Sequence, residues 1–107
     1  MTDKSLLKQA LETIQSELTE GHLDSASTEI DAQLKHYPDD PNLAYLRALH
    51  YRLTGDSESA LKVLSALTGS FPNMARAHQE VALNSVNVAK ATGSLVYSII
   101  DRNVPIK

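Results

Sequence analysis

Histidines are the residues of this chain that could hold a metal ion, because the sequence contains no cysteine. The four histidines are His22, His36, His50 and His78. A zinc site needs three or four ligands that converge from close spacing or from neighbouring faces. His22 and His36 fall in or beside predicted turns, whereas His50 and His78 lie at different heights on their helices. We therefore expect no metal site, and histidines that lie on the surface or pack between helices.

Carboxylates are the groups that could support acid–base catalysis, and Glu17 with Glu20 share one predicted helix. Acid–base catalysis needs a cleft that shifts the pKa of such carboxyl groups. The positions of Glu17 and Glu20 indicate a solvated helix face instead. The sequence has no phosphate-binding glycine loop, no HExxH or GxSxG motif and no dinucleotide fingerprint. Without cysteine, disulfides and a thiolate nucleophile are excluded as well. We expect neither an enzyme activity nor a cofactor.

Composition narrows the class of protein further. The chain has 107 residues, enough for one domain, with 42% hydrophobic and 21% charged residues. The net charge of −3 does not suggest nucleic acid as a partner, since that requires a clustered basic face. No apolar run is long enough to span a membrane, and the amphipathic, acidic N-terminus does not resemble a secretory signal. These features predict a cytoplasmic protein.

Helix start and stop signals divide the chain into amphipathic helices. In the central stretch, residues 41–72, Asp40 caps a helix that begins at Pro41 and ends near Gly55. Asp56 or Ser57 caps a second helix, which Gly69 and Pro72 should end. Before this stretch, the spacing predicts helices over residues 3–19 and from residue 24 to the turn at 36–41. After it, Asn73 should cap a fifth helix that ends at Gly93.

A period of 34 residues relates the central stretch to the chain before it. Gly21 matches Gly55, Pro38 matches Pro72, and small Ala26 matches Ala60; Ile30 matches Leu64. A helix–turn–helix unit repeated every 34 residues resembles the tetratricopeptide repeat (TPR) family. The resemblance implies an all-α, antiparallel helix-hairpin stack with two full repeats and a partial third. We place the repeats at about 7–40, 41–74 and a degenerate 75–107 of one domain, with Ala26 and Ala60 at close helix crossings.

In such a stack the first helix of each pair lines the concave side, where partners bind. The positions that match this face combine an apolar centre with flanking arginines, as binding hot spots do. An equally open alternative is that Tyr45 and Leu49 simply pack against neighbouring helices. The predicted partner-binding residues are Lys8, Leu11, Gln15, Asn42, Tyr45, Leu49, Arg52, Arg76, Gln79 and Leu83.

The end of the chain departs from the repeat. Residues 95–106 are rich in large aliphatic side chains, too apolar for a typical disordered tail. They could form a short sixth helix over 95–102 or a strand, and a frayed terminus is the alternative. We expect self-association through this segment, most simply as a homodimer, with Leu95, Val96, Ile99 and Ile100 at the contact.

The function that this sequence predicts is protein–protein interaction. The chain would be a small scaffold that binds a peptide or a partner helix on its concave face. The alternative is an N-terminal docking or dimerisation module of a larger enzyme, because the run from Met74 to Ala82 is similar to repeats that precede bacterial sulfotransferase domains. In that case all catalysis would lie elsewhere.

Overall fold

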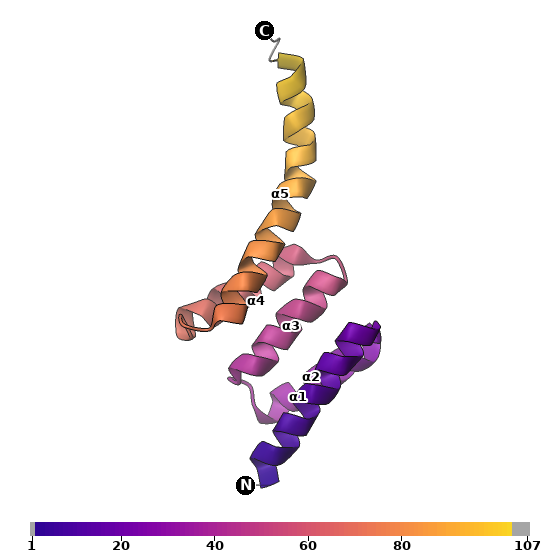
Figure 1. Cartoon of the computed structure of the whole chain (residues 1–107), viewed down its shortest axis with the longest axis vertical. Helices are drawn as coiled ribbons and strands as arrows, with labels where there is room; N and C mark the ends of the chain where they lie inside the picture. Colours follow the sequence, from indigo (N-terminus) through magenta and orange to yellow (C-terminus); the bar gives the residue numbers. More distant parts are fainter. Residues whose placement is uncertain (1, 104–107) are drawn as a thin grey trace.

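Five α-helices make up the computed structural model, which describes residues 2–103 and, among these, the side chains of residues 5–91. The helices follow one another as α1 (Thr2–Glu20), α2 (Leu23–His36), α3 (Pro41–Leu53), α4 (Ser57–Ser70) and α5 (Ala75–Asn103). Consecutive helices pack as antiparallel pairs, so the expected all-α helix-hairpin stack is confirmed (Figure 1). No helix among the described residues is both long enough and apolar enough to cross a membrane.

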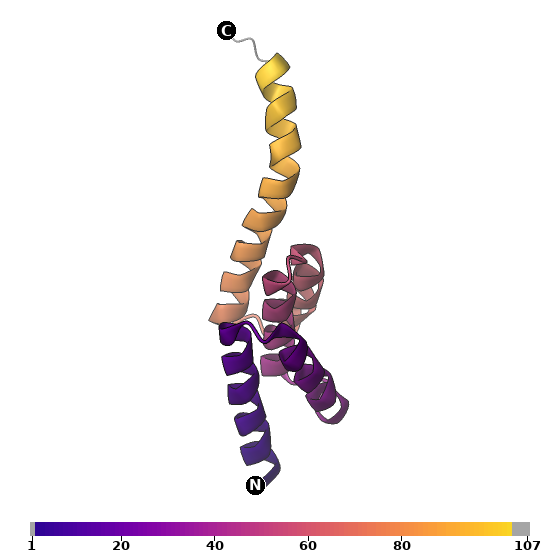
Figure 2. The same cartoon turned by 90° about the vertical axis from the view of Figure 1, so that its right-hand side faces the viewer.

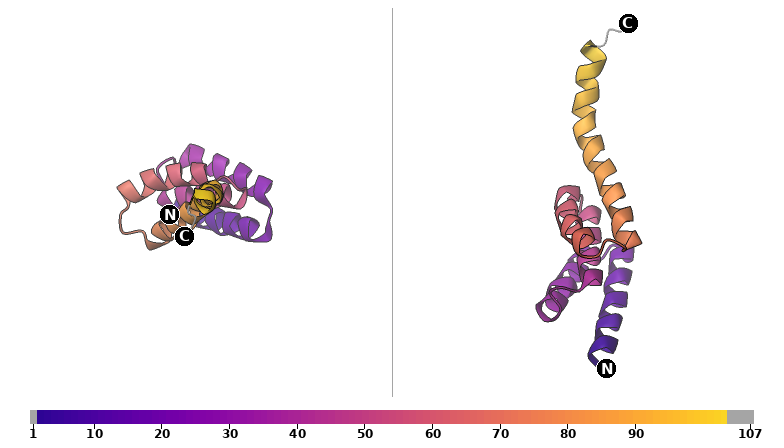
Figure 3. Two further views of the ribbon diagram at one scale, coloured as in Figure 1. Left: turned by 90° about the horizontal axis from the view of Figure 1, so that it is seen from above. Right: turned by 90° about the vertical axis from the view of Figure 1, so that its left-hand side faces the viewer.

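The pairs stack so that alternate helices lie on the same side of the molecule. Helix α3 lies between α1 and α5 (Figure 1), and α2 and α4 lie together on the other side of the stack (Figures 2 and 3). Helix α3 contacts all four of the other helices, whereas α1 has backbone contacts only with α2 and α3 in the described part of the chain. The side formed by α1, α3 and α5 is therefore built from the first helix of each pair.

Local signals fix the turns between the helices. The Leu43 backbone N–H donates to Asp40 Oδ2 at 3.0 Å, and the Ser59 N–H donates to Asp56 Oδ1 at 3.1 Å, so both predicted carboxylate caps are confirmed. Gly21 and Gly55 end α1 and α3 in the left-handed region, with φ of 86° and 88°. A side chain is strained in that conformation, which explains why glycine recurs there 34 residues apart.

Two other predicted stops are wrong. Gly69 lies inside α4, which continues to Ser70, and Gly93 lies inside α5, which continues to Asn103. A helical glycine costs only about 1 kcal/mol relative to alanine, so it does not end a helix whose neighbours continue it. The fifth helix also begins later than predicted, at Ala75, because Asn73 lies in the preceding turn. Residues 95–102 belong to α5 and form neither a separate sixth helix nor a strand.

Two apolar clusters hold the stack together. The first joins α1, α2 and α3 through Ile14, Leu18, Ala26, Ile30, Leu43, Leu46 and Leu49. The second joins α3, α4 and α5 through Ala48, Ala60, Leu64, Leu67 and Ala77. Ala26 and Ala60 are fully buried in these clusters, as their matched positions predict. Helices that cross at about 8–10 Å leave no room for a larger side chain there.

Helix α5 gives the molecule its elongated shape. Its first half packs on α4 and α3, and its second half projects beyond the other helices (Figures 1 and 2). The structure accordingly measures 66 × 29 × 18 Å.

Candidate protein-binding groove

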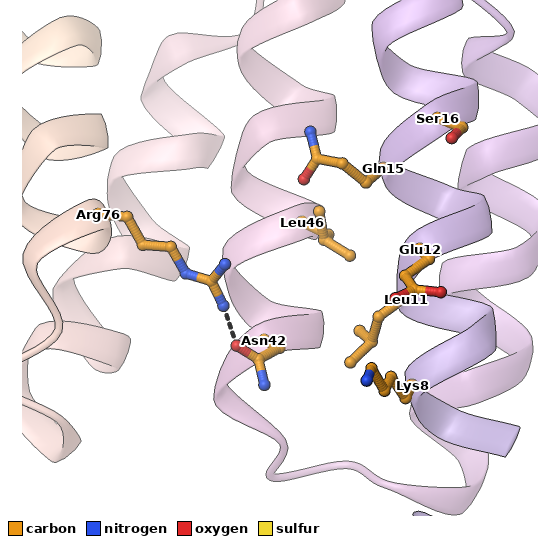
Figure 4. Close-up of a pocket in the computed structure, with 8 residues that line it drawn as sticks. All are labelled: Lys8, Leu11, Glu12, Gln15, Ser16, Asn42, Leu46 and Arg76. Carbon is orange, nitrogen blue, oxygen red and sulfur yellow. Dashed lines mark hydrogen bonds between the residues drawn. The ribbon is translucent and has the colours of Figure 1, made fainter. Parts of the chain in front are cut away.

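A hollow of about 520 Å³ opens between α1, α3 and α5, on the side that the sequence analysis predicts as the binding face. It brings together five of the ten predicted residues, Lys8, Leu11, Gln15, Asn42 and Arg76 (Figure 4). Glu12, Ser16 and Leu46 complete the lining. The floor is apolar at Leu11 and Leu46, and cations project from both sides.

The three helices contribute equivalent positions to this hollow. Lys8, Asn42 and Arg76 are each 34 residues apart, and all three line it. The Arg76 side chain crosses from α5 to α3, where its guanidinium donates to Asn42 Oδ1 (Figure 4). The same guanidinium lies over the Tyr45 ring, 4.6 Å from its centroid. A cation over an aromatic face contributes about 0.5–1 kcal/mol at an exposed site, so Arg76 is held in place across the groove.

A second hollow of about 350 Å³ continues the groove toward the other end of α1 and α3. Gln15 borders both hollows, and Tyr45, Leu49 and Arg52 line the second one together with Glu80. Gln79 and Leu83 are exposed on α5 and line neither hollow.

Leu49 differs most from its predicted role. Only 8% of its surface is exposed, because it packs with Ile14 and Leu18 of α1 in the first apolar cluster. The open alternative, that Leu49 serves helix packing, is therefore the correct one for this residue. Tyr45 is half-buried and packs on both clusters, with its ring covered by Arg76.

Arg52 forms an ion pair within the protein, with Glu80 of α5. Its Nε donates to Glu80 Oε1 at 2.8 Å and its Nη2 donates to Glu80 Oε2 at 3.0 Å. The hydrogen bond to the Glu80 carboxylate raises the pKa of Arg52 above its usual value. Asn84 is fully buried and donates from Nδ2 to the Glu80 carbonyl oxygen at 2.7 Å and to Glu80 Oε1 at 3.2 Å.

Sequence reasoning missed this buried polar group, although a signal was present. Arg52 and Glu80 occupy the positions that correspond, at the 34-residue period, to Leu18 and Leu46. Both leucines are buried in the core. A cation and an anion that each replace a core leucine indicate a pair, since buried charges are usually paired.

The polar contacts of Arg47 serve helix packing. Arg47 of α3 pairs with Asp31 and donates to Ser27 Oγ at 3.0 Å, which ties α3 to α2. Burial lowers the pKa of nearby His50, and the Arg47 charge adds to the effect. In the described part of the chain, no three histidine or carboxylate side chains converge as metal ligands.

The predicted self-association residues Leu95, Val96, Ile99 and Ile100 lie on the projecting half of α5. Their side chains are outside the described residues. No family model, curated protein or solved structure matches this chain.

Proposed function

We propose that this protein is a small TPR-type scaffold that binds a peptide or a partner helix in the groove between α1, α3 and α5. The observation that carries the proposal is the hollow lined by Lys8, Asn42 and Arg76, three equivalent positions on the first helix of each pair. The 34-residue period, the glycine turns and the buried alanines at the helix crossings support the repeat assignment. The proposal assigns no reaction to the chain.

The lining of the groove indicates which ligands it favours. Lys8 and Arg76 supply positive charge at one end, and Glu12 is the acidic group of the lining. Leu11 and Leu46 form an apolar floor between the cations (Figure 4). A short segment with a carboxylate beside an apolar side chain matches this arrangement, because charge complementarity sets orientation while apolar burial supplies affinity.

Selection from a library of random peptides displayed on phage would test the proposal with a defined probe. The double variant Tyr45→Ala/Arg76→Glu removes the ring on which the Arg76 guanidinium lies and reverses the charge that Arg76 supplies. We expect peptides selected on the wild-type protein to bind this variant more than about tenfold more weakly, a loss of about 1.4 kcal/mol. Circular dichroism should remain helical, because Arg76 is exposed and Tyr45 is only half-buried.

Lys62→Glu is the matched control, because it makes the same charge change on an exposed position of α4, on the other side of the molecule. It should leave peptide binding unchanged. Equal binding of the selected peptides to the wild type and to the double variant would show that the groove is not the interface.

A further inference from the structure

In the described part of the chain, no further helix packs on α5 in the way that α2 packs on α1 and α4 packs on α3. Helix α1 is followed by α2, and α3 by α4, each packed antiparallel on the helix before it. At the 34-residue period, Ile14 of α1 and Ala48 of α3 correspond to Ala82 of α5. Ile14 and Ala48 are fully buried, yet Ala82 is exposed. The face of α5 that should meet a following helix is therefore open.

Exposed apolar side chains mark this open face. Val86 is 50% exposed and Leu83 is 48% exposed, and Ala82 and Ala89 are exposed beside them. The opposite side of α5, at Ala77, Glu80 and Asn84, is buried against the other helices. With 3.6 residues per turn, positions 82, 86 and 89 fall well away from that buried side, so another helix can reach them.

In the sequence, a stripe of apolar residues and glycine runs from position 82 through 86, 89, 93 and 96 to 100, into the projecting half of α5. Successive positions of this stripe are 4, 3, 4, 3 and 4 residues apart, which is the heptad spacing of a two-helix contact. It covers about 27 Å of helix, at 1.5 Å per residue. Every position in the stripe is apolar or glycine: Ala82, Val86, Ala89, Gly93, Val96 and Ile100.

We propose that a second copy of this chain covers the open face, with the two α5 helices antiparallel about a two-fold axis near residue 91. In this register position 82 meets 100, 86 meets 96, and 89 meets 93 of the partner. Each small residue then meets a larger or an equally small one: Ala82 with Ile100, Val86 with Val96, and Ala89 with Gly93. Ala89 and Gly93 at the centre let the two helices approach closely.

Two features favour a second copy over an unrelated helix. The stripe is complementary to itself when reversed, as a two-fold contact requires. The antiparallel direction is also the one in which α2 covers α1 and α4 covers α3. The partner α5 thus takes the position on α5 that α2 takes on α1 and α4 takes on α3, and position 97 of the partner comes beside exposed Leu83.

Disulfide trapping in the full chain tests both the contact and its direction, because the protein has no cysteine of its own. The variant Val86→Cys/Val96→Cys should give a covalent dimer under mild oxidation. The two cysteines of one helix are too far apart to bond to each other. Val86→Cys/Ala91→Cys is the matched control, with its second cysteine off the stripe, and should stay largely monomeric on a denaturing gel. A covalent dimer from Val86→Cys alone would indicate parallel helices and overturn the proposed register.

Light scattering measures the association without cross-linking. The wild type should show twice the monomer mass at high micromolar concentration, and Val86→Glu should raise the dimer dissociation constant more than about tenfold. Ala91→Glu places the same charge on another exposed position of α5 and should leave the dimer intact. A monomeric wild type, or an unchanged dimer in Val86→Glu, would refute the proposal. Arg76→Glu should remain dimeric, so this test is independent of peptide binding in the groove.

Discussion

Arg52 of α3 and Glu80 of α5 meet through two hydrogen bonds of 2.8 and 3.0 Å, so that one ion pair links two helices that are not neighbours in sequence. Only 4% of the Glu80 surface is exposed. A carboxylate buried to this extent needs its cation, because the cost of removing charge from water is large. The pair lies at the second hollow of the groove and joins α5 to α3.

The first prediction concerns this ion pair. Arg52→Met should lower the free energy of unfolding by about 3 kcal/mol, since Glu80 is left buried without its cation and keeps only the hydrogen bond from Asn84. The double variant Arg52→Met/Glu80→Leu should recover most of the loss, because an apolar pair replaces the charges. Urea unfolding followed by circular dichroism measures both. A loss below about 1 kcal/mol for the single variant would mean that the pair behaves like a surface salt bridge.

The second prediction concerns the crossing of α3 and α4. Ala60 is fully buried in the second cluster, so Ala60→Leu would overpack the contact and should cost about 1–3 kcal/mol. Ala66→Leu adds the same atoms at an exposed position of α4 and should change stability little. Thermal unfolding compares the two, and equal melting temperatures would show that the crossing has room for the larger side chain.

The third prediction compares substitutions of two glycines in the second helix pair, Gly69 and Gly55. Gly69 is helical, and a Cβ built on it meets no atom within 4 Å, so Gly69→Ala should stabilise the protein by about 0.5–1 kcal/mol. Gly55 has equally open surroundings but a φ of 88°, so Gly55→Ala should destabilise by about 1 kcal/mol or more. Denaturant unfolding of both variants should give changes of opposite sign. A stabilising Gly55→Ala would contradict the left-handed turn.

The fourth prediction concerns pH. Burial first, and the Arg47 charge second, lower the pKa of His50 below 6.5, while Asp31 and Asp24 act in the opposite direction. The unfolded chain then binds a proton at His50 more readily than the folded chain does. Stability should therefore fall as the pH drops below about 6.5.

His50→Gln should remove this part of the pH dependence. Unfolding free energies of the two proteins should run parallel above pH 6.5, and the wild type should lose more stability below it. Urea titrations at a series of pH values would show this. Curves that stay parallel on the acidic side as well would exclude His50 as the source.

Sequence reasoning succeeded where the determinants are local. The carboxylate caps at Asp40 and Asp56 and the left-handed turns at Gly21 and Gly55 each follow from a short stretch of chain. The buried alanines follow from the 34-residue period. It failed at Gly69 and Gly93, because the helical cost of glycine is small enough for neighbouring residues to override.

The groove was predictable only in part. The 34-residue period and helix geometry predicted that Lys8, Asn42 and Arg76 lie at equivalent positions on the concave face, and all three line the first hollow. The burial of Leu49 and the ion pair of Arg52 with Glu80 depend on how closely α1, α3 and α5 approach one another. That distance is set by the side chains of two or three helices jointly, so one helical stripe does not reveal it.

Helix α3 supplies residues to both apolar clusters: Leu43, Leu46 and Leu49 to the first and Ala48 to the second. Every cooperative opening that separates one end of the stack from the other must therefore break contacts of this helix. Helices α1 and α2 can detach while the second cluster stays closed, whereas α3 loses its amide protection only when both clusters open. In hydrogen exchange, the slowest amides should therefore lie in the middle of the chain, along α3, and the rates should rise toward α1.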